Sequence, residues 1–164
     1  MVLRRSSRLR AAERPSDSAA VRAATEALLA RRDFARGELS ARLCSRGFDP
    51  GAVEAVMVEL AADGILDDQR FAQNYVSWHA ARGQGPIRIA AQLRSRGLPE
   101  GLIDAALASG PDWPALARRA RTARFGRQPP ASWADRARQA RFLQYRGFSS
   151  DHIRAATGAD ADLD

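Results

Sequence analysis

The stretch LCSRGF at residues 43–48 returns as LRSRGL at residues 93–98 and as LQYRGF at residues 143–148. The glycines of the three copies are therefore spaced at a constant interval of 50 residues. Self-similarity at a fixed period predicts a repeat architecture. The central glycines of the three copies, here called the corner glycines, are Gly47, Gly97 and Gly147.

Each corner glycine is expected to join two helices. In the first copy, Leu39 and Leu43 precede the glycine at helical spacing. Glycine readily adopts the left-handed conformation that closes a Schellman cap at a helix C-terminus. Asp49 then provides an N-cap for the next helix, and Phe48 can contact both Leu43 before the glycine and Val53 after it. We therefore interpret the corner as a joint between helices and not as a reactive site.

The sequence predicts an all-α fold, an elongated, curved array of three tandem three-helix repeats that resemble helix–turn–helix motifs. A further helical pattern precedes each corner, and Asp67 and Asp112 are the predicted N-caps of two of these helices. Repeats of about 45 residues are close to the lower size limit for an independent core, so neighbouring repeats are expected to share one. The predicted repeats are residues 19–66, 67–110 and 111–158.

Two short segments are expected to lie outside the repeats. Residues 1–18 are rich in Arg and Ser and are interpreted as a disordered basic tail, with an organellar transit peptide as the alternative. Residues 159–164 are interpreted as an acidic C-terminal tail. No apolar stretch is long enough for a membrane span, and a single cysteine is typical of a reducing compartment, so we expect a cytoplasmic protein.

The basic residues are concentrated in the last third of the chain. The net charge is +7, and every basic residue is Arg because the chain contains no Lys. Residues 111–154 contain ten Arg and three acidic residues. Such a surface fits an anionic partner, nucleic acid or an acidic protein, and the alternative is a solvated basic face. The candidate residues for binding a partner or nucleic acid are Arg82, Arg88, Arg118, Arg119, Arg121, Arg124, Arg127, Arg136, Arg138 and Arg141.

No catalytic or metal-binding pattern is recognised. The two histidines, His79 and His152, fit no metal-ligand spacing, and no glycine-rich phosphate loop follows a strand. We therefore expect no enzymatic activity, no cofactor and no metal ion.

Several large aromatic residues could stack on nucleic-acid bases. The chain has few bulky side chains with which to fill a core, so we interpret these residues as core residues instead. They are Trp78, Trp113, Trp133 and Tyr145.

An alternative function is that of a free-standing helix–turn–helix protein that binds DNA and regulates transcription. In such proteins the second helix of the motif enters the major groove. Here the second helices begin with DPGAVE at 49–54, PEGLID at 99–104 and SSDHIR at 149–154. Acidic and small residues dominate these starts, and phosphates repel acidic groups. Only the third copy, with His152 and Arg154, fits base readout.

Residues 65–98, ILDDQRFAQNYVSWHAARGQGPIRIAAQLRSRGL, resemble the signature of the RecX family of regulatory proteins. Residues 28–48, LLARRDFARGELSARLCSRGF, also resemble the first unit of that family. The third copy departs from the pattern at Gln139, which stands where Leu39 and Ile89 stand in the other copies. The residues that match the signature are Asp67, Asp68, Arg70, Phe71, Ala72, Tyr75, Arg82, Gly83, Gly85, Pro86, Ile89, Leu93 and Gly97.

The resemblance implies an all-helical array of three-helix repeats that binds the filament of the RecA recombinase on single-stranded DNA. It also implies a modulating, usually inhibitory effect on the ATPase, strand-exchange and co-protease activities of the recombinase, in DNA repair, recombination and the SOS response. We accordingly expect a monomer that lies along the filament groove, with the recombinase and the single-stranded DNA in or near the filament as partners. Arg118, Arg119 and Arg121 are expected to face the anionic surface.

Overall fold

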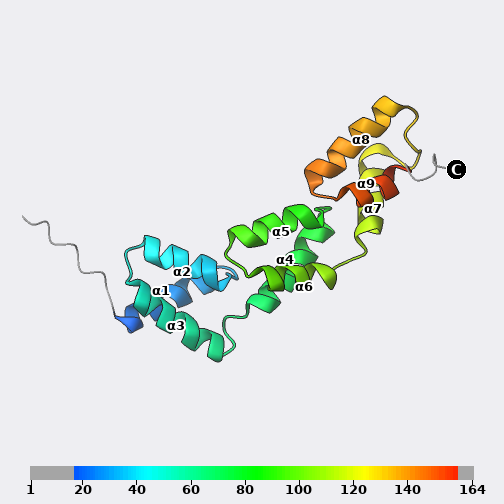
Figure 1. The fold of residues 1–164 in the computed structure, drawn as a ribbon. Coiled ribbons are helices and arrows are strands. Elements are labelled where there is room, and N and C mark those ends of the chain that lie inside the picture. Colours follow the sequence, from blue (N-terminus) through cyan, green and yellow to red (C-terminus); the bar gives the residue numbers. More distant parts are fainter. Residues whose placement is uncertain (1–16, 159–164) are drawn as a thin grey trace, which may run out of the picture. The chain divides into compact units, whose positions relative to one another are not determined.

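The computed structural model describes residues 17–158, and every regular element in this range is an α-helix (Figure 1). The predicted all-α fold of three-helix repeats is confirmed. In chain order the helices are α1 (Ser18–Leu29), α2 (Arg36–Ser45), α3 (Pro50–Ala62), α4 (Asp68–Ala81), α5 (Pro86–Ser95), α6 (Glu100–Ala108), α7 (Trp113–Phe125), α8 (Trp133–Arg146) and α9 (Ser150–Thr157).

The two predicted tails fall mainly on residues 1–16 and 159–164, which lie outside the described residues. Asp17 and Ser18, which the prediction placed in the first tail, begin α1 instead. The Asp17 side chain accepts a hydrogen bond of 2.9 Å from the backbone N–H of Ala19 and so acts as the N-cap.

All three corner glycines adopt the predicted left-handed conformation, with φ of 95° at Gly47, 79° at Gly97 and 94° at Gly147. At the first corner, the N–H of Gly47 donates to the carbonyl of Cys44 at 3.0 Å, and the N–H of Phe48 donates to that of Leu43 at 3.3 Å. This pair of hydrogen bonds defines the Schellman motif. The corresponding pairs are also present at the other two corners, so the predicted joint is confirmed in every repeat.

The predicted N-caps also form. The carboxylates of Asp49, Asp67 and Asp112 each accept a backbone N–H three residues further on, at 3.0, 3.0 and 2.9 Å. Ser149 caps α9 in a capping box with His152, whereas Pro99, at the equivalent place in the second repeat, makes no side-chain cap. Local sequence therefore determines where most helices begin.

The described residues divide into two compact units. The first unit, residues 17–34 and 38–66, contains α1, most of α2 and α3, with α1 packed against α3. Its core is mainly aliphatic, and Phe48 packs on it beside the buried Leu43 and Val53, as the staple predicts. The buried residues of this core are Val21, Leu28, Phe34, Leu39, Leu43, Val53, Val56, Met57, Leu60 and Leu66.

The second unit, residues 35–37 and 67–158, contains the helices of both the second and the third repeat. One continuous core runs through these two repeats, so the expectation that neighbouring repeats share a core is confirmed for them. Within each repeat the first helix packs against the third, α4 against α6 and α7 against α9. The buried residues of this core are Ala35, Ala72, Val76, Ala80, Ile89, Leu93, Leu98, Ile103, Ala106, Leu116, Ala117, Leu143, Phe148 and Ala156.

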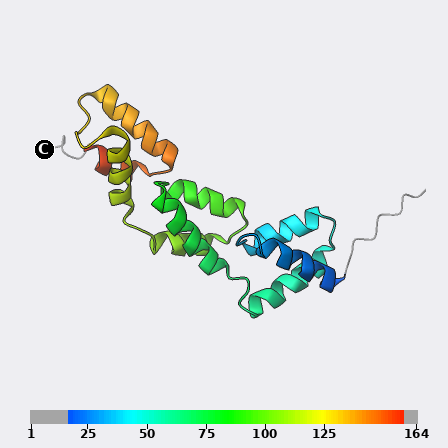
Figure 2. The same cartoon turned by 180° about the vertical axis from the view of Figure 1, so that it is seen from behind.

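The third-repeat corner docks on the first turn of α5 in both views of the ribbon (Figures 1 and 2). The N–H of Gly85 donates to the carbonyl of Arg146 at 2.8 Å, and the N–H of Ile87 donates to that of Gly147 at 3.0 Å. Gly85 is the N-cap of α5 and has no side chain to cap the helix. The corner carbonyls therefore satisfy N–H groups that a helix start otherwise leaves unpaired.

This docking brings two backbones into close contact. A Cβ atom on Gly85 would lie 2.4 Å from the carbonyl carbon of Gly147, and a Cβ on Gly147 would lie 2.3 Å from the Cβ atom of Arg88. A similar approach occurs at residues 35–37 of the second unit, where a Cβ on Gly37 would lie 3.0 Å from the carbonyl oxygen of Gly97. A second use of the corner is therefore to pack against the start of the middle helix of the preceding repeat.

The middle helix of the third repeat differs from the other two at its start. Helix α8 begins at Trp133, three residues earlier relative to its corner glycine than α2 or α5. Asp135 consequently occupies, inside α8, the position that Gly85 has at the start of α5.

A buried polar pair replaces the aliphatic contact at Gln139. Gln139 is 5% exposed, and its side-chain oxygen accepts a hydrogen bond of 2.8 Å from Nε of Arg121, which is 7% exposed. The Arg121 guanidinium also donates from Nη2 to the backbone carbonyl of Gln128. The departure from the repeat pattern at Gln139 is thus matched by an arginine that reaches it from α7.

Replacing Gly85 by Ala is expected to destabilise the second unit by about 1–3 kcal/mol, because the new methyl group overlaps the backbone of Gly147. Gly101→Ala is the matched control, since Gly101 lies within α6 and has open space around its Cβ position. The control should be neutral or slightly stabilising, because Ala favours a helix over Gly. Denaturant unfolding followed by circular dichroism measures both, and equal stability of the two variants would contradict the docking.

Gln139→Leu, which restores the aliphatic pattern of the other repeats, is expected to lower the free energy of unfolding by about 1–3 kcal/mol. The reason is that the Nε donor of Arg121 then stays buried without its acceptor. The double variant Arg121→Met/Gln139→Leu should recover most of the loss, because it removes both members of the pair. Thermal unfolding of the three proteins tests this, and a Gln139→Leu variant as stable as the parent would show that the pair is dispensable.

Candidate partner and nucleic-acid interface

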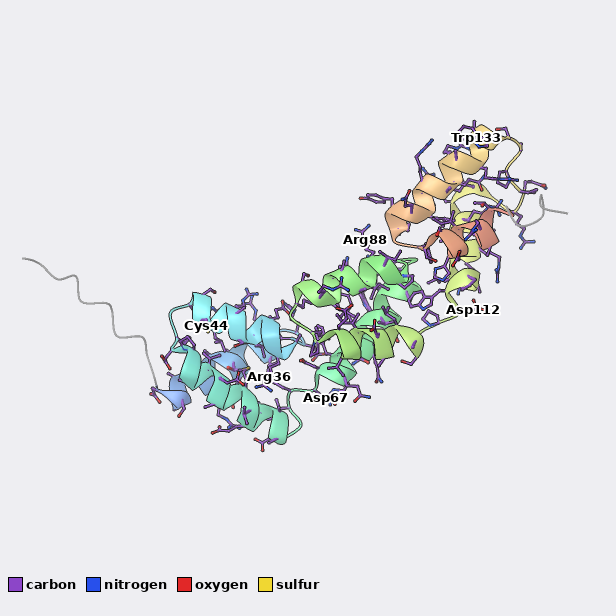
Figure 3. All side chains as sticks on the ribbon, viewed as in Figure 1. Arg36, Cys44, Asp67, Arg88, Asp112 and Trp133 are labelled. Carbon is purple, nitrogen blue, oxygen red and sulfur yellow. The ribbon has the colours of Figure 1, made fainter. Side chains whose placement is uncertain are left out.

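The candidate arginines lie mainly on α7 and α8. Arg118, Arg119 and Arg124 are exposed on α7, and Arg127 is exposed in the loop that follows. On α8, Arg138 and Arg141 are exposed and Arg136 is half-buried. Outside the third repeat, Arg82 is exposed at the end of α4, and Arg88 is half-buried on α5 (Figure 3).

Arg121 does not belong to this surface. Its guanidinium group is buried and already engaged with Gln139 and Gln128, so it is not available to a partner. The sequence did not indicate this, because Arg121 lies among exposed arginines and only its pairing with Gln139 marks it as a core residue.

Most of the remaining candidates have no carboxylate partner within residues 17–158. In the first unit, by contrast, Arg22 bridges Glu26, Glu59 and Asp63, and Arg32 pairs with Glu38 at 2.6 Å. Arg138 on α8 pairs with Asp135 at 3.1 Å. The candidates without such a partner are Arg82, Arg88, Arg118, Arg119, Arg124, Arg127 and Arg141.

A pocket of about 390 Å³ lies between the end of α4 and helices α7 and α8. Leu116, Ala120 and Phe142 supply its apolar lining. Its cationic lining consists of Arg82, Arg119, Arg124 and Arg146. Arg146 is not among the ten candidate residues, although it belongs to the basic third repeat and the arginine before each corner glycine, at positions 46, 96 and 146, was the available signal.

The large aromatic residues do not all lie in the core. The core interpretation is confirmed for Trp113, which packs against the second-unit core and donates its indole N–H to the carbonyl of Leu107 at 3.1 Å. It is wrong for Trp78, Trp133 and Tyr145, which are 53%, 84% and 76% exposed. Trp133 stands at the first turn of α8 (Figure 3).

Arginines accompany two of the three exposed rings. The Arg82 guanidinium carbon lies 3.3 Å from the centroid of the Trp78 ring, and that of Arg88 lies 5.3 Å from the centroid of Tyr145. Both distances are within the range of cation–π interactions. Arg88 also donates to the backbone carbonyl of Tyr145 at 3.3 Å, which ties α5 to the end of α8.

The positive charge around these rings affects the pKa of His79. Its pKa is lowered from the ordinary value of 6.5, first because burial disfavours the charged imidazolium. A hydrogen bond with Gln84 opposes this shift, and the positive charges of Arg96, Arg82 and Arg88 lower the pKa further. The three guanidinium groups therefore act on one imidazole at the end of α4.

The helix starts on which the transcription-factor alternative depends carry carboxylates. Asp49 uses its carboxylate to cap α3. Glu100 on α6 accepts from Arg94 at 2.9 Å, and Asp151 on α9 pairs with Arg154. Carboxylates at these positions would face DNA phosphates in a helix–turn–helix complex, which is unfavourable.

Within residues 17–158, no cluster of three or more His, Cys, Asp or Glu side chains is arranged to hold a metal ion. No helix in the same range combines the length and the apolar character that crossing a membrane requires.

Comparison with known proteins identifies relatives over most of the chain. Residues 67–107 match the model of the second three-helix domain of RecX, and residues 114–157 match that of its third three-helix domain. The regulatory protein RecX of Halorhodospira halophila is 50% identical over 148 residues, which cover 90% of this chain and 91% of that protein. The regulatory protein RecX of Pseudomonas fluorescens Pf-5 is 42% identical and covers 82% of this chain and 87% of that protein.

Solved structures show the same fold. The crystal structure of RecX from Lactobacillus salivarius has a TM-score of 0.75 at 19% identity and covers 90% of this chain and 97% of its own. A second crystal structure of a regulatory protein RecX has a TM-score of 0.71 at 22% identity and covers 86% of this chain and 71% of its own. With matched domain models over more than half of its length and a relative at 50% identity, the chain belongs to the RecX family of regulatory proteins.

Proposed function

We propose that this regulatory protein binds the filament that the RecA recombinase forms on single-stranded DNA, along the filament groove, and inhibits its ATPase, strand-exchange and co-protease activities. It acts as a monomer in the cytoplasm, and its partners are the recombinase and the single-stranded DNA in or near the filament. The observation that carries the proposal is the set of exposed arginines on α7, α8 and at the end of α4 that have no carboxylate partner within residues 17–158.

Unpaired arginines on one surface favour an anionic partner for a physical reason. Like charges one helical turn apart repel each other and destabilise a helix by a few tenths of a kcal/mol per pair. An anionic surface removes this repulsion and releases its own counterions when it binds. A recombinase filament presents both acidic protein groups and DNA phosphates, so either source can satisfy the arginines.

The contacts with the filament are assigned to the exposed arginines of α7. Arg118, Arg119 and Arg124 lie on this helix without carboxylate partners in the described range, and Arg119 and Arg124 also line the pocket beside Phe142. Arg121 is excluded from the contacts because it is buried. The repeat architecture supplies further helices with which to contact successive recombinase subunits.

Replacing Arg118, Arg119 and Arg124 together by Gln is expected to weaken binding to the recombinase–DNA filament about tenfold or more at low salt, because three ionic contacts are lost. The plot of log affinity against log salt should also flatten, by about 0.7 for each single-strand phosphate contact removed. Filament co-sedimentation measures the affinity, and the concentration needed to inhibit the recombinase ATPase should rise in parallel.

The control is the Arg31→Gln/Arg42→Gln/Arg46→Gln variant, which removes the same charge from exposed positions of the first unit. It should retain most of the affinity and the salt dependence. Equal losses in the two variants would show that only net charge matters, and an unchanged α7 variant would remove this helix from the interface.

A further inference from the structure

We propose that the second unit contains a stacking site for single-stranded nucleic acid, formed by the exposed rings of Trp78 and Tyr145 together with Arg82 and Arg88. The inference rests on the proposed function and deepens it, because it assigns the contact with the single strand to residues outside the α7 surface. These four residues are called the stacking site below.

The first ring is exposed but held in place. Trp78 is 53% exposed on α4, although the core positions of that helix are filled by Ala72, Val76 and Ala80. The Arg82 guanidinium lies 3.3 Å from its ring centroid and donates to the Trp78 backbone carbonyl at 3.1 Å. The edge of the ring meets His79 at a centroid distance of 4.6 Å. A ring fixed in this way loses little conformational entropy when a base stacks on it.

The second ring comes from the other repeat of the same unit. Tyr145 is 76% exposed at the end of α8, immediately before Arg146 and the corner glycine. Arg88 of α5 lies 5.3 Å from its ring centroid and hydrogen-bonds its backbone carbonyl. The stacking site is therefore assembled only where the third-repeat corner docks on α5.

Contacts between arginines connect the two rings. Arg146 donates from Nη1 to the backbone carbonyl of Arg82 at 3.2 Å, and it follows Tyr145 in the chain. His79, which contacts Trp78, experiences the charges of both Arg82 and Arg88. The site thus combines two exposed rings with several guanidinium groups.

This combination fits a single strand better than a duplex or a protein. Every base has a π-face that stacks on an aromatic ring, but in a duplex these faces are covered by neighbouring bases. Protein anchors are usually buried in pockets, whereas Trp78 and Tyr145 stay exposed and neither Arg82 nor Arg88 has a carboxylate partner in the described range. Phosphates between successive bases would pair with those guanidinium groups.

The experiment measures binding of a fluorescein-labelled oligothymidylate to the full chain by fluorescence anisotropy, without recombinase. Trp78→Ala and Tyr145→Ala should each weaken binding about 5- to 150-fold, the range that loss of one stacked base gives. Their salt dependence should stay that of the parent, because no charge is removed. Arg82→Gln/Arg88→Gln should weaken binding and also flatten the salt dependence.

Trp78→Phe and Tyr145→Phe keep a ring at each position and should bind nearly as well as the parent, which separates stacking from a purely structural effect. Trp133→Ala is the matched control, since Trp133 is 84% exposed and no arginine within residues 17–158 is placed over its ring. Binding to a duplex of the same length should be unaffected by the two Ala substitutions. Thermal unfolding checks that each variant is folded.

Unchanged oligothymidylate binding in the double variant Trp78→Ala/Tyr145→Ala would overturn the proposal. So would equal losses for single-stranded and duplex DNA, or a loss confined to binding of the recombinase filament, which would assign the rings to a protein contact. A different result would contradict the proposed function alone. If the parent binds oligothymidylate through these rings but shows no affinity for the recombinase filament, the stacking site is supported and the filament role is rejected.

Discussion

The left-handed conformation of the corner glycines lets one helix end and the next begin within three or four residues, and the rest of the fold depends on this geometry. At each corner, the N–H of the glycine donates a hydrogen bond to the carbonyl three residues earlier. The N–H of the apolar residue after the glycine donates to the carbonyl five residues earlier. The same apolar residue then packs against both helices, as Phe148 does at 2% exposure beside the fully buried Leu143. The next interaction depends on this geometry, because the corner carbonyls of Arg146 and Gly147 point outward and accept the unpaired N–H groups of α5.

Much of the fold could be predicted because its determinants are local. Schellman caps, aspartate N-caps and apolar spacing each involve residues within one or two helical turns, so Gly47, Asp67 and Asp112 could be interpreted from sequence alone. The close contact between Gly85 and Gly147 could not, since it joins residues far apart in the chain. The sequence around Gly85 does not show whether a glycine is required there by a close contact or is an ordinary turn residue.

The candidate site was predicted less completely, for a related reason. Charge density placed the basic surface in the third repeat, and the exposed Arg118, Arg119 and Arg124 agree with that placement. Whether an individual arginine faces solvent depends on what lies opposite it, and Arg121 is buried because Gln139 on another helix accepts its hydrogen bond. Three aromatic residues were predicted to be buried, because large rings usually are, but they are exposed. Their exposure is a feature of the tertiary structure that composition alone does not reveal.

The early start of α8 means that the series of corner contacts ends at the third repeat. Helix α5 accepts a corner because Gly85 leaves its first turn bare, whereas α8 presents Asp135 inside an additional helical turn at the equivalent place. The first turn of α8 is therefore not bare, and the contact that joins the second and third repeats has no equivalent place on α8. Stacked repeats commonly end in a capping repeat whose outer face is polar, and Asp135 with the additional helical turn gives the third repeat this character.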